Sequence, residues 1–275
     1  MRKTPRIVSV LALSACMCAL PTAQDTADVF QGEEIERFLA TARVTAMEDI
    51  GVGITRPERA TLELDGVTHL AAFKDVDDPL EPGGTQMADG SIIASLQDSY
   101  RLEVAAYVVD RIIGLGMVPA TIERRIRGHT GSLAWWVESK MTEAGRINQG
   151  IAPPDPEAWN REVLKLRLFD QLIYNIDRNL DNLLITEDFE IRLIDHSRSF
   201  QSFAELRNPE RLTMFSRSLL KGLERLELEE LRERLGEPNY LLDGQIRALL
   251  ARRNLILELA RQRVAEFGEE AVLYR

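Results

Sequence analysis

The stretch YNIDRNLDNLLITEDFEIRLIDHSRSF, from Tyr174 to Phe200, gathers short polar side chains where a helical pattern gives way to strands. Asp177 is followed five residues later by Asn182, and Asp195 comes thirteen residues after that, beyond a predicted hairpin turn. Asp and Asn are common in turns, so turn formation alone is one explanation. The other is a carboxylate base beside two oxygen ligands for a hard cation such as Mg²⁺.

Upstream residues carry further groups that a phosphate-binding site would need. Lys74 ends an apolar strand in HLAAFKD, where it is either a solvated strand end or a contact for phosphates. Glu103 lies at the start of the next predicted helix. An acidic residue there is either favoured by the helix dipole or forms an ion pair with Lys74. IGVGITRP places Gly51 and Gly53 between two strands. This turn lacks the third glycine of a typical Gly-rich loop, so a plain turn is the alternative.

The first half of the chain predicts strands around one main helix. Three antiparallel strands are expected within 44–76, and Asp65–Gly66 is the strongest hairpin signal among them. Apolar periodicity predicts a helix over 99–115, and two more strands are expected around a turn at 128–131.

The second half predicts helices. The Pro-rich segment QGIAPPDPEAW, within 146–160, is expected to be a linker. Helices are predicted over 160–173, 202–206, 209–226, 228–235 and 242–267. A strand-rich half followed by a helical half indicates an α+β fold.

The N-terminus has the pattern of a secretory signal over residues 1–23, with basic residues before a short apolar run. An apolar first helix of the domain is the alternative. LSAC resembles a bacterial lipobox, which would make Cys16 a lipid anchor; ordinary cleavage near Ala23 is the other outcome. A flexible leader is expected over 24–35. The signal predicts export to a bacterial periplasm, or anchoring at the cell envelope.

Composition narrows the function further. The chain of 275 residues is 45% hydrophobic and carries a formal net charge of −10, which argues against nucleic acid as a general partner. Both cysteines, Cys16 and Cys18, lie in the signal-like segment, so no disulfide, cysteine metal site or cysteine nucleophile is expected after its removal.

Several of these features occur in a recognisable order. Lys74 and Glu103 are followed by VVDRIIGLGMVP, LFDQLIYNIDRNLDNLLI and LIDHSRSF. Together they resemble the protein-kinase-like superfamily in its atypical branch, which includes phosphatidylinositol 3-/4-kinase-like proteins and secretory-pathway kinases. The resemblance covers residues 44–200. It implies a two-lobed fold, with a small antiparallel-sheet N-lobe and one main helix over 36–145, and a helical C-lobe over 161–275.

The resemblance also implies a role for each polar residue. Lys74 would contact the phosphates of ATP or another nucleotide, and Glu103 would hold that lysine. Asp177 would orient or deprotonate an acceptor hydroxyl. Asn182 and Asp195 would bind Mg²⁺ or Mn²⁺.

Nucleotide contacts are implied elsewhere as well. Gly51 and Gly53 would lie over the phosphates, and a hinge over 136–141, with Glu138 and Met141, would meet the adenine. The acceptor, a protein or a small molecule, is not identified.

The sequence also departs from the usual kinase motifs. His-Arg-Asp is replaced by Asn-Ile-Asp at 175–177, and Asp-Phe-Gly by Asp-His-Ser at 195–197. No Ala-Pro-Glu follows, so control by activation-loop phosphorylation is not expected. Arg178 and Asp181 are open as substrate contacts or as a solvated local pair.

Three functions follow from the sequence. The first is an active phosphotransferase that moves a γ-phosphoryl group to a hydroxyl. The second is a nucleotide-binding protein without transfer, or a transferase of another group such as AMP. The third is an interaction protein whose acidic, helical second half binds a partner.

Overall fold

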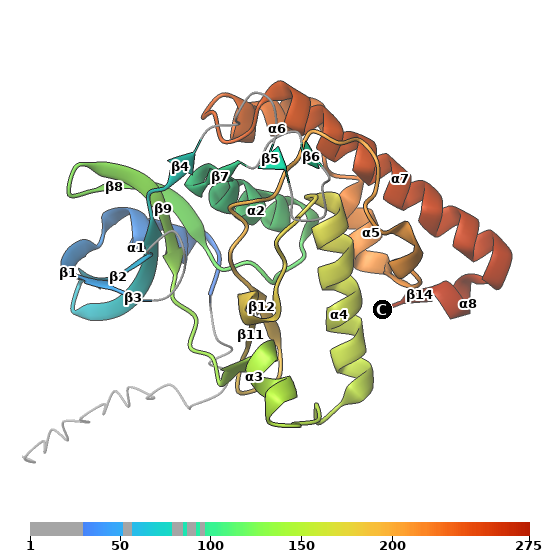
Figure 1. The fold of residues 1–275 in the computed structure, drawn as a ribbon, viewed down its shortest axis with the longest axis horizontal. Coiled ribbons are helices and arrows are strands. Elements are labelled where there is room, and N and C mark those ends of the chain that lie inside the picture. The colour runs from blue at the N-terminus through green and yellow to red at the C-terminus, as the bar shows by residue number, and fades with distance from the viewer. Residues whose placement is uncertain (1–29, 52–56, 79–84, 87–91, 94–96) are drawn as a thin grey trace, which may run out of the picture.

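The computed structural model describes residues 30–51, 57–78, 85–86, 92–93 and 97–275 (Figure 1). Strands and one long helix form the first half, and helices dominate the second, which confirms the predicted α+β class. The signal-like segment, with Cys16, lies outside the described residues.

A five-stranded antiparallel sheet organises the first half, in the order β1-β2-β3-β9-β8. Its strands are β1 (Arg43–Asp49), β2 (Glu58–Leu64), β3 (Val67–Lys74), β8 (Thr121–Ile126) and β9 (His129–Trp135). The predicted hairpin at Asp65–Gly66 is confirmed, since both residues have positive φ, at 50° and 80°. That pair of left-handed residues matches the twist of the flanking strands.

The second hairpin turns earlier than predicted. Arg127 and Gly128 take the positive φ values, whereas Gly131 lies inside β9. A side chain at Gly131 would bring its Cβ to 2.2 Å from the carbonyl oxygen of Lys74. Glycine is therefore needed because β9 passes very close to the end of β3, and this close approach fixes the position of Lys74.

Two helices accompany the sheet. Helix α1 (Glu33–Thr41) begins inside the leader predicted over 24–35, with acidic residues in its first turn that favour a helix start. Helix α2 (Tyr100–Ile113) confirms the helix predicted over 99–115. The Ser99 side chain caps its first turn, and Gly114 ends it with a φ of 69°.

The turn after α2 joins the two halves. The buried Asp110 carboxylate accepts hydrogen bonds from the backbone N–H groups of Gly116, Met117 and Val118. The Met117 carbonyl in turn accepts from the Leu193 N–H at 2.9 Å. VVDRIIGLGMVP therefore fixes α2 against the strand that precedes Asp195.

A small sheet and several helices make up the second half. The small sheet consists of β10 (Met141–Thr142), β11 (Leu183–Ile185) and β12 (Ile191–Leu193). The helices are α3 (Glu143–Asn148), α4 (Pro156–Leu172), α5 (Arg217–Leu223), α6 (Leu228–Leu231), α7 (Asp243–Phe267) and α8 (Glu269–Val272). Shorter elements are the 3₁₀ turns η1 (Leu180–Asn182) and η2 (Pro209–Arg211), the π turn η3 (Arg232–Gly236), and the two-residue strands β4 (Asp77–Asp78), β5 (Thr85–Gln86), β6 (Ile92–Ile93), β7 (Asp98–Ser99), β13 (Phe215–Ser216) and β14 (Leu273–Tyr274).

The linker predicted over 146–160 is largely structured. It contains the end of α3 and the first turns of α4, which begins at Pro156 rather than at residue 160. The Asp155 side chain caps α4, and proline suits the first helical position because its missing N–H is not needed there. The chain enters the small sheet earlier, where Met141 pairs with Ile185.

Two predicted helices differ from the structure. No helix forms over 202–206, because the buried Arg252 guanidinium takes up the carbonyl oxygens of Gln201 and Phe203. The helix predicted over 209–226 is divided into η2, β13 and α5. Strand β13 pairs in parallel with β14, a long-range contact that helical periodicity cannot reveal.

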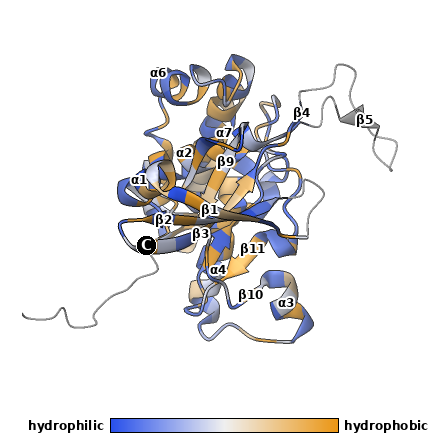
Figure 2. Ribbon diagram, turned by 90° about the vertical axis from the view of Figure 1, so that its left-hand side faces the viewer, coloured by the Kyte–Doolittle hydropathy of each residue, from blue (hydrophilic) through white to orange (hydrophobic). Residues whose placement is uncertain are grey.

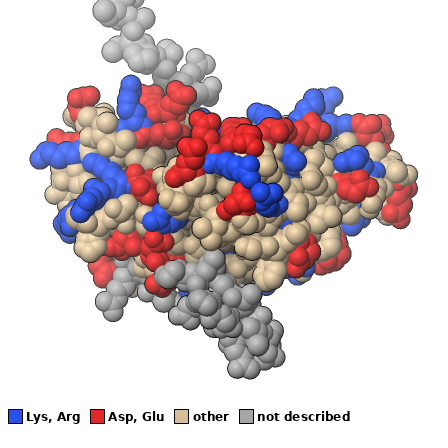
Figure 3. All heavy atoms as spheres, turned by 90° about the horizontal axis from the view of Figure 1, so that it is seen from above, with Lys and Arg blue, Asp and Glu red and all other residues tan. Residues whose placement is uncertain are grey.

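The buried apolar side chains form one core that runs from the sheet into the helical half. Figure 2 shows hydrophobic residues on β9 and on β11. Charges of both signs alternate over the face shown in Figure 3. Within the described residues, no helix is long and apolar enough to span a bilayer.

Gly222 tests the contact between α5 and α2. A Cβ at Gly222 would lie 1.8 Å from the Ile113 carbonyl oxygen, whereas Gly244 in α7 has open space at that position. We expect Gly222→Ala to lower the free energy of unfolding by about 1–3 kcal/mol, because the two helices must move apart. Gly244→Ala should leave it unchanged or raise it by up to about 1 kcal/mol. Urea unfolding measures both, and an equal response of the two variants would contradict the close contact.

Candidate active site

A cleft of about 820 Å³ lies between the five-stranded sheet and the small sheet β10-β11-β12. Both apolar and polar side chains line it. Lys74, Glu103, Asp177, Asn182 and Asp195, which were singled out from the sequence, all line this one cleft. Residues as far apart as 74 and 195 are therefore brought together as the resemblance implied.

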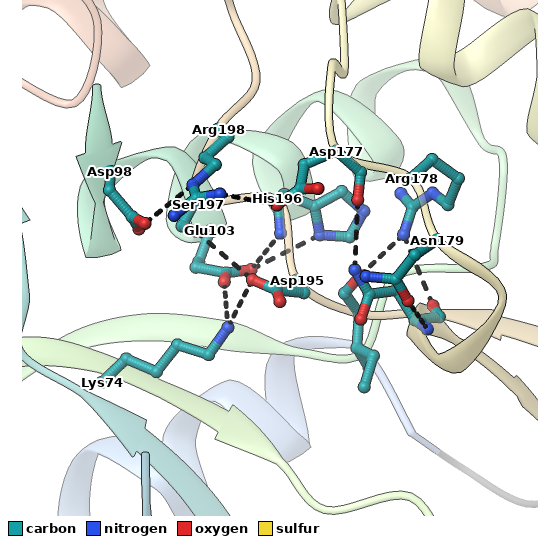
Figure 4. A network of polar contacts seen from close by, with 12 residues as sticks. Lys74, Asp98, Glu103, Asp177, Arg178, Asn179, Asp195, His196, Ser197 and Arg198 are labelled. Atoms are coloured by element: carbon teal, nitrogen blue, oxygen red, sulfur yellow. Dashed lines mark hydrogen bonds and ion pairs between the residues drawn. The ribbon is translucent and has the colours of Figure 1, made fainter. Parts of the chain in front are cut away.

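Lys74 is held between two carboxylates (Figure 4). Its ammonium nitrogen lies 2.6 Å from Glu103 Oε1 and 2.9 Å from Asp195 Oδ1. Burial alone would lower the pKa of Lys74, but the charges of Glu103 and Asp195 outweigh it and raise the pKa above its ordinary value. The lysine is therefore charged at neutral pH.

Glu103 is more than a helix-start acid. Burial would raise its pKa, but Lys74 and His196 together hold the pKa well below its ordinary value. Its second oxygen accepts the His196 backbone N–H at 2.9 Å. Glu103 thus joins β3, α2 and the segment after β12 at one buried point.

Asp195 sits on a strained backbone. Its φ is 60°, which is uncommon for a residue other than glycine, and it lies two residues after the end of β12. Its Oδ1 accepts from Lys74 and, at 3.3 Å, from the Ser197 hydroxyl. Left-handed residues of this kind concentrate at functional sites, where the surrounding contacts hold them in place.

The loop that carries Asp177 is fixed through its backbone. The Asn175 side chain accepts the Asp177 N–H at 2.9 Å, and the Asn182 side-chain nitrogen donates to the Asp177 carbonyl at 3.3 Å. The Asp177 side chain is 48% exposed. Its carboxylate is therefore accessible from the cleft, although its backbone is held on both sides.

Arg178 and Asp181 do not form a local pair with each other. Arg178 is mostly buried, and it pairs with Asp170 at 3.1 Å and donates to the Ile194 carbonyl at 2.7 Å. Asp181 lines the cleft and accepts from the Thr142 hydroxyl at 3.0 Å. Arg178 is a structural support for the loop, and Asp181 lies where a ligand can reach it.

The glycines and hinge residues that were expected to contact the nucleotide differ in whether they line the cleft. Glu138 lines the cleft within the segment that follows β9. Met141 does not line it, because it pairs with β11 and packs against the hydrophobic core. Gly51 is exposed, and its N–H donates to Asp49 Oδ1 at 2.7 Å. Gly53 lies outside the described residues.

Asn182 and Asp195 fit the ligand set of a hard cation. The Ile194 N–H donates to the Asn182 carbonyl at 3.1 Å, which places the two ligand residues on adjacent segments. The Asn182 amide nitrogen is already used, which leaves its side-chain oxygen for a cation. No group of three or more His, Cys, Asp or Glu side chains suited to a metal occurs in the described part of the chain. Two protein oxygens suffice for Mg²⁺ when substrate phosphates supply further ligands.

Two residues at the cleft were not identified from the sequence. Arg198 Nε lies 2.9 Å from Asp98 Oδ2, and its NH1 lies 3.1 Å from Asp177 Oδ2 (Figure 4). Burial would lower the pKa of Arg198, and its hydrogen bond to Asp98 raises the pKa above the ordinary value. No sequence pattern announces this contact, because it joins residues 100 positions apart.

His196 makes the stability of the site depend on pH. Complete burial lowers the pKa of His196, and the charge of Arg178 lowers it further. The hydrogen bond to Glu103 opposes this shift. The unfolded chain therefore binds a proton more readily than the folded protein does. The stabilisation from neutral His196 is complete above pH 6.5 and declines as the pH falls below that value.

The free energy of unfolding should therefore fall between about pH 7.5 and about pH 5.5. With a chelator present, we expect this fall to be smaller in His196→Gln than in the wild type. His129→Gln, at an exposed histidine, is the control; an unchanged slope in His196→Gln would contradict the assignment.

Comparison with solved structures places this geometry in a known fold. Hydra Fam20 with sugar superimposes with a TM-score of 0.64 at 14% identity, over 87% of this chain and 91% of that chain. The golgi casein kinase gives a TM-score of 0.58 at 14% identity, over 87% and 78%. The Helicobacter pylori proinflammatory kinase CtkA gives 0.54 at 10% identity, over 83% and 98%. The chain therefore has the atypical protein-kinase-like fold that the sequence motifs indicated.

The similarity to these proteins is found in the structure and not in the sequence. No protein-family model matches the sequence, and no curated protein matches it.

Proposed function

We propose that this protein is a phosphotransferase that moves the γ-phosphoryl group of ATP to a hydroxyl group. The observation that carries the proposal is the buried Lys74–Glu103 pair facing Asp195, with the accessible Asp177 carboxylate in the same cleft. Kinase-like neighbours support the fold on which it rests.

Each residue would have a distinct task. Lys74 would neutralise nucleotide phosphates, and Glu103 would keep the lysine in place. Asp177 would accept the hydroxyl proton as the acceptor oxygen forms a bond to the γ-phosphorus. The bond from that phosphorus to the bridging oxygen breaks, and ADP leaves with the electron pair. Asn182 and Asp195 would hold Mg²⁺ or Mn²⁺, which supplies positive charge against the phosphates.

The apolar part of the cleft would take the adenine. Trp135, Trp136 and Val137 line the cleft beside Glu138, so ring surfaces and backbone groups lie together at this end. Lys74 and Asp195 line the same cleft. One end thus suits a flat base and the other a charged phosphate chain.

The acceptor class is open to direct test. One structural neighbour is named a casein kinase and another was solved with sugar. We therefore propose to offer both casein and free sugars as hydroxyl acceptors. The signal-like N-terminus supports a further proposal, that the protein acts after export and meets its acceptor in the cell envelope.

Parallel incubations with α-labelled and γ-labelled ATP test the function. Transfer of the γ label to an acceptor, or its release as phosphate, in the presence of Mg²⁺ supports the proposal. Incorporation of the α label would instead indicate AMP transfer. Binding without release of either label would indicate a nucleotide-binding protein, and the proposed transfer would then be wrong.

A further inference from the structure

Arg198 joins two carboxylates that differ in their exposure. The Asp98 side chain is 14% exposed and contacts Nε, whereas Asp177 is 48% exposed and contacts NH1. An ion pair with an exposed partner contributes little, because water competes for both charges. The contact to Asp177 is therefore the easier of the two to exchange for another anion.

The Asp98 side of the contact is built into the fold. The Ser99 N–H donates to the Ser197 carbonyl at 3.0 Å, which ties β7 to the residue before Arg198. The Ser99 hydroxyl donates to Asp77 Oδ1 at 2.5 Å, which holds β7 from its other side. Asp98 thus anchors the guanidinium at one edge and leaves its other edge directed at the cleft (Figure 4).

Arg198 is the second cation of an acidic cleft. Within its described lining there are two cations, Lys74 and Arg198. The acidic residues of the lining are Asp98, Glu103, Glu138, Asp177, Asp181 and Asp195. Lys74 is already shared by two of them. A nucleotide that carries a third phosphate into this acidic cleft needs a further positive group beside the one that a metal ion supplies.

We propose that Arg198 recognises the transferable γ-phosphoryl group and thereby controls access to Asp177. This inference rests on the proposed function of the cleft. Without a γ-phosphate, the guanidinium pairs with Asp177 Oδ2 and competes for the oxygen that would accept a proton. When ATP is bound, NH1 leaves Asp177 for a non-bridging γ-phosphate oxygen, while Nε stays on Asp98. Asp177 is then free to accept the hydroxyl proton, and the arginine offsets the charge of the phosphoryl group during transfer.

The Arg198 side chain would thus give the protein a preference for ATP over ADP. ADP has no γ-phosphate, so its complex leaves Arg198 on Asp177. Removal of the guanidinium should therefore weaken ATP binding and hardly change ADP binding. A purely structural arginine would change both affinities alike, because it would alter the shape of the whole cleft.

Calorimetric titrations of the full chain with Mg²⁺–ATP and with Mg²⁺–ADP test the proposal. We expect the ratio of the two dissociation constants to shift by about tenfold against ATP in Arg198→Ala, since charge-assisted hydrogen bonds are strong. Arg198→Lys keeps the charge and should restore part of the preference. Arg232→Ala is the control, because Arg232 also contacts two carboxylates, Asp243 and Glu229, and its side chain is 36% exposed against 28% for Arg198.

The outcomes separate this proposal from the function on which it rests. Failure of the wild-type protein to bind either nucleotide would refute the nucleotide site itself. Normal binding with an unchanged ATP-to-ADP ratio in Arg198→Ala would refute the role of Arg198 alone. If that variant does not fold, Asp98→Asn and Arg198→Lys decide the matter. A ratio equal to the wild-type ratio in both would overturn the proposal, and a smaller shift in the same direction would support it.

Discussion

Asp177→Asn is expected to lower the rate of γ-phosphoryl transfer by about 10²–10⁴-fold, because asparagine cannot accept the hydroxyl proton. The substitution keeps the size of the side chain. The backbone of residue 177 is held by the Asn175 and Asn182 side chains, so the loop should keep its shape. Nucleotide affinity should therefore change little. Rates with labelled ATP and affinities by calorimetry measure the two effects separately.

Asp181→Asn is the matched control for that variant. Asp181 lines the same cleft, and its carboxylate bonds the Thr142 hydroxyl rather than any of the proposed catalytic groups. Its transfer rate should stay within about tenfold of the wild type. Equal rates for wild type and Asp177→Asn would show that another group accepts the proton, or that transfer takes place elsewhere.

Lys74→Met has the second largest expected effect. Methionine keeps much of the apolar stem and removes the ammonium that bridges Glu103 and Asp195. Loss of one preorganised charged donor in a closed site lowers rates by about 10²–10³-fold. The same change leaves the buried Glu103 without its cation, so it should also lower the free energy of unfolding. Transfer rates at a temperature where the variant remains folded distinguish the two effects.

A surface lysine provides the comparison. Lys165 pairs with Glu162 at 2.8 Å on α4, away from the cleft. Lys165→Met should change both the rate and the stability only slightly. If Lys74→Met kept wild-type activity, Lys74 would be a structural cation, and the assigned phosphate contact would be wrong.

Local sequence signals predicted the elements whose causes are local. Asp65–Gly66 identified the first hairpin because two left-handed residues in succession are rare outside such turns. The apolar stripe of α2 located that helix to within two residues. Lys74 and Glu103 were paired correctly because a strand end and the next helix meet in the resembled fold.

Long-range contacts account for what the sequence did not reveal. The segment over 202–206 is not helical because Arg252, some fifty residues away, binds the carbonyl oxygens of Gln201 and Phe203. The Arg198–Asp98 contact likewise joins distant segments. These two features depend on partners far away in the sequence, which no local pattern identifies. The start of α4 differs for a local reason, because proline indicates a linker but also suits the first helical position, and Pro156 begins α4 after the Asp155 cap.

Calorimetric titration of the purified protein with ATP, with and without Mg²⁺, tests the central claim most directly. The account predicts binding that requires Mg²⁺, that a chelator reverses, and that Asp195→Ala removes or weakens severely. Asp188→Ala, in the exposed turn between β11 and β12, should bind as the wild type does. A folded protein that binds neither ATP nor another nucleotide, or one whose binding ignores both Mg²⁺ and Asp195, would contradict the account.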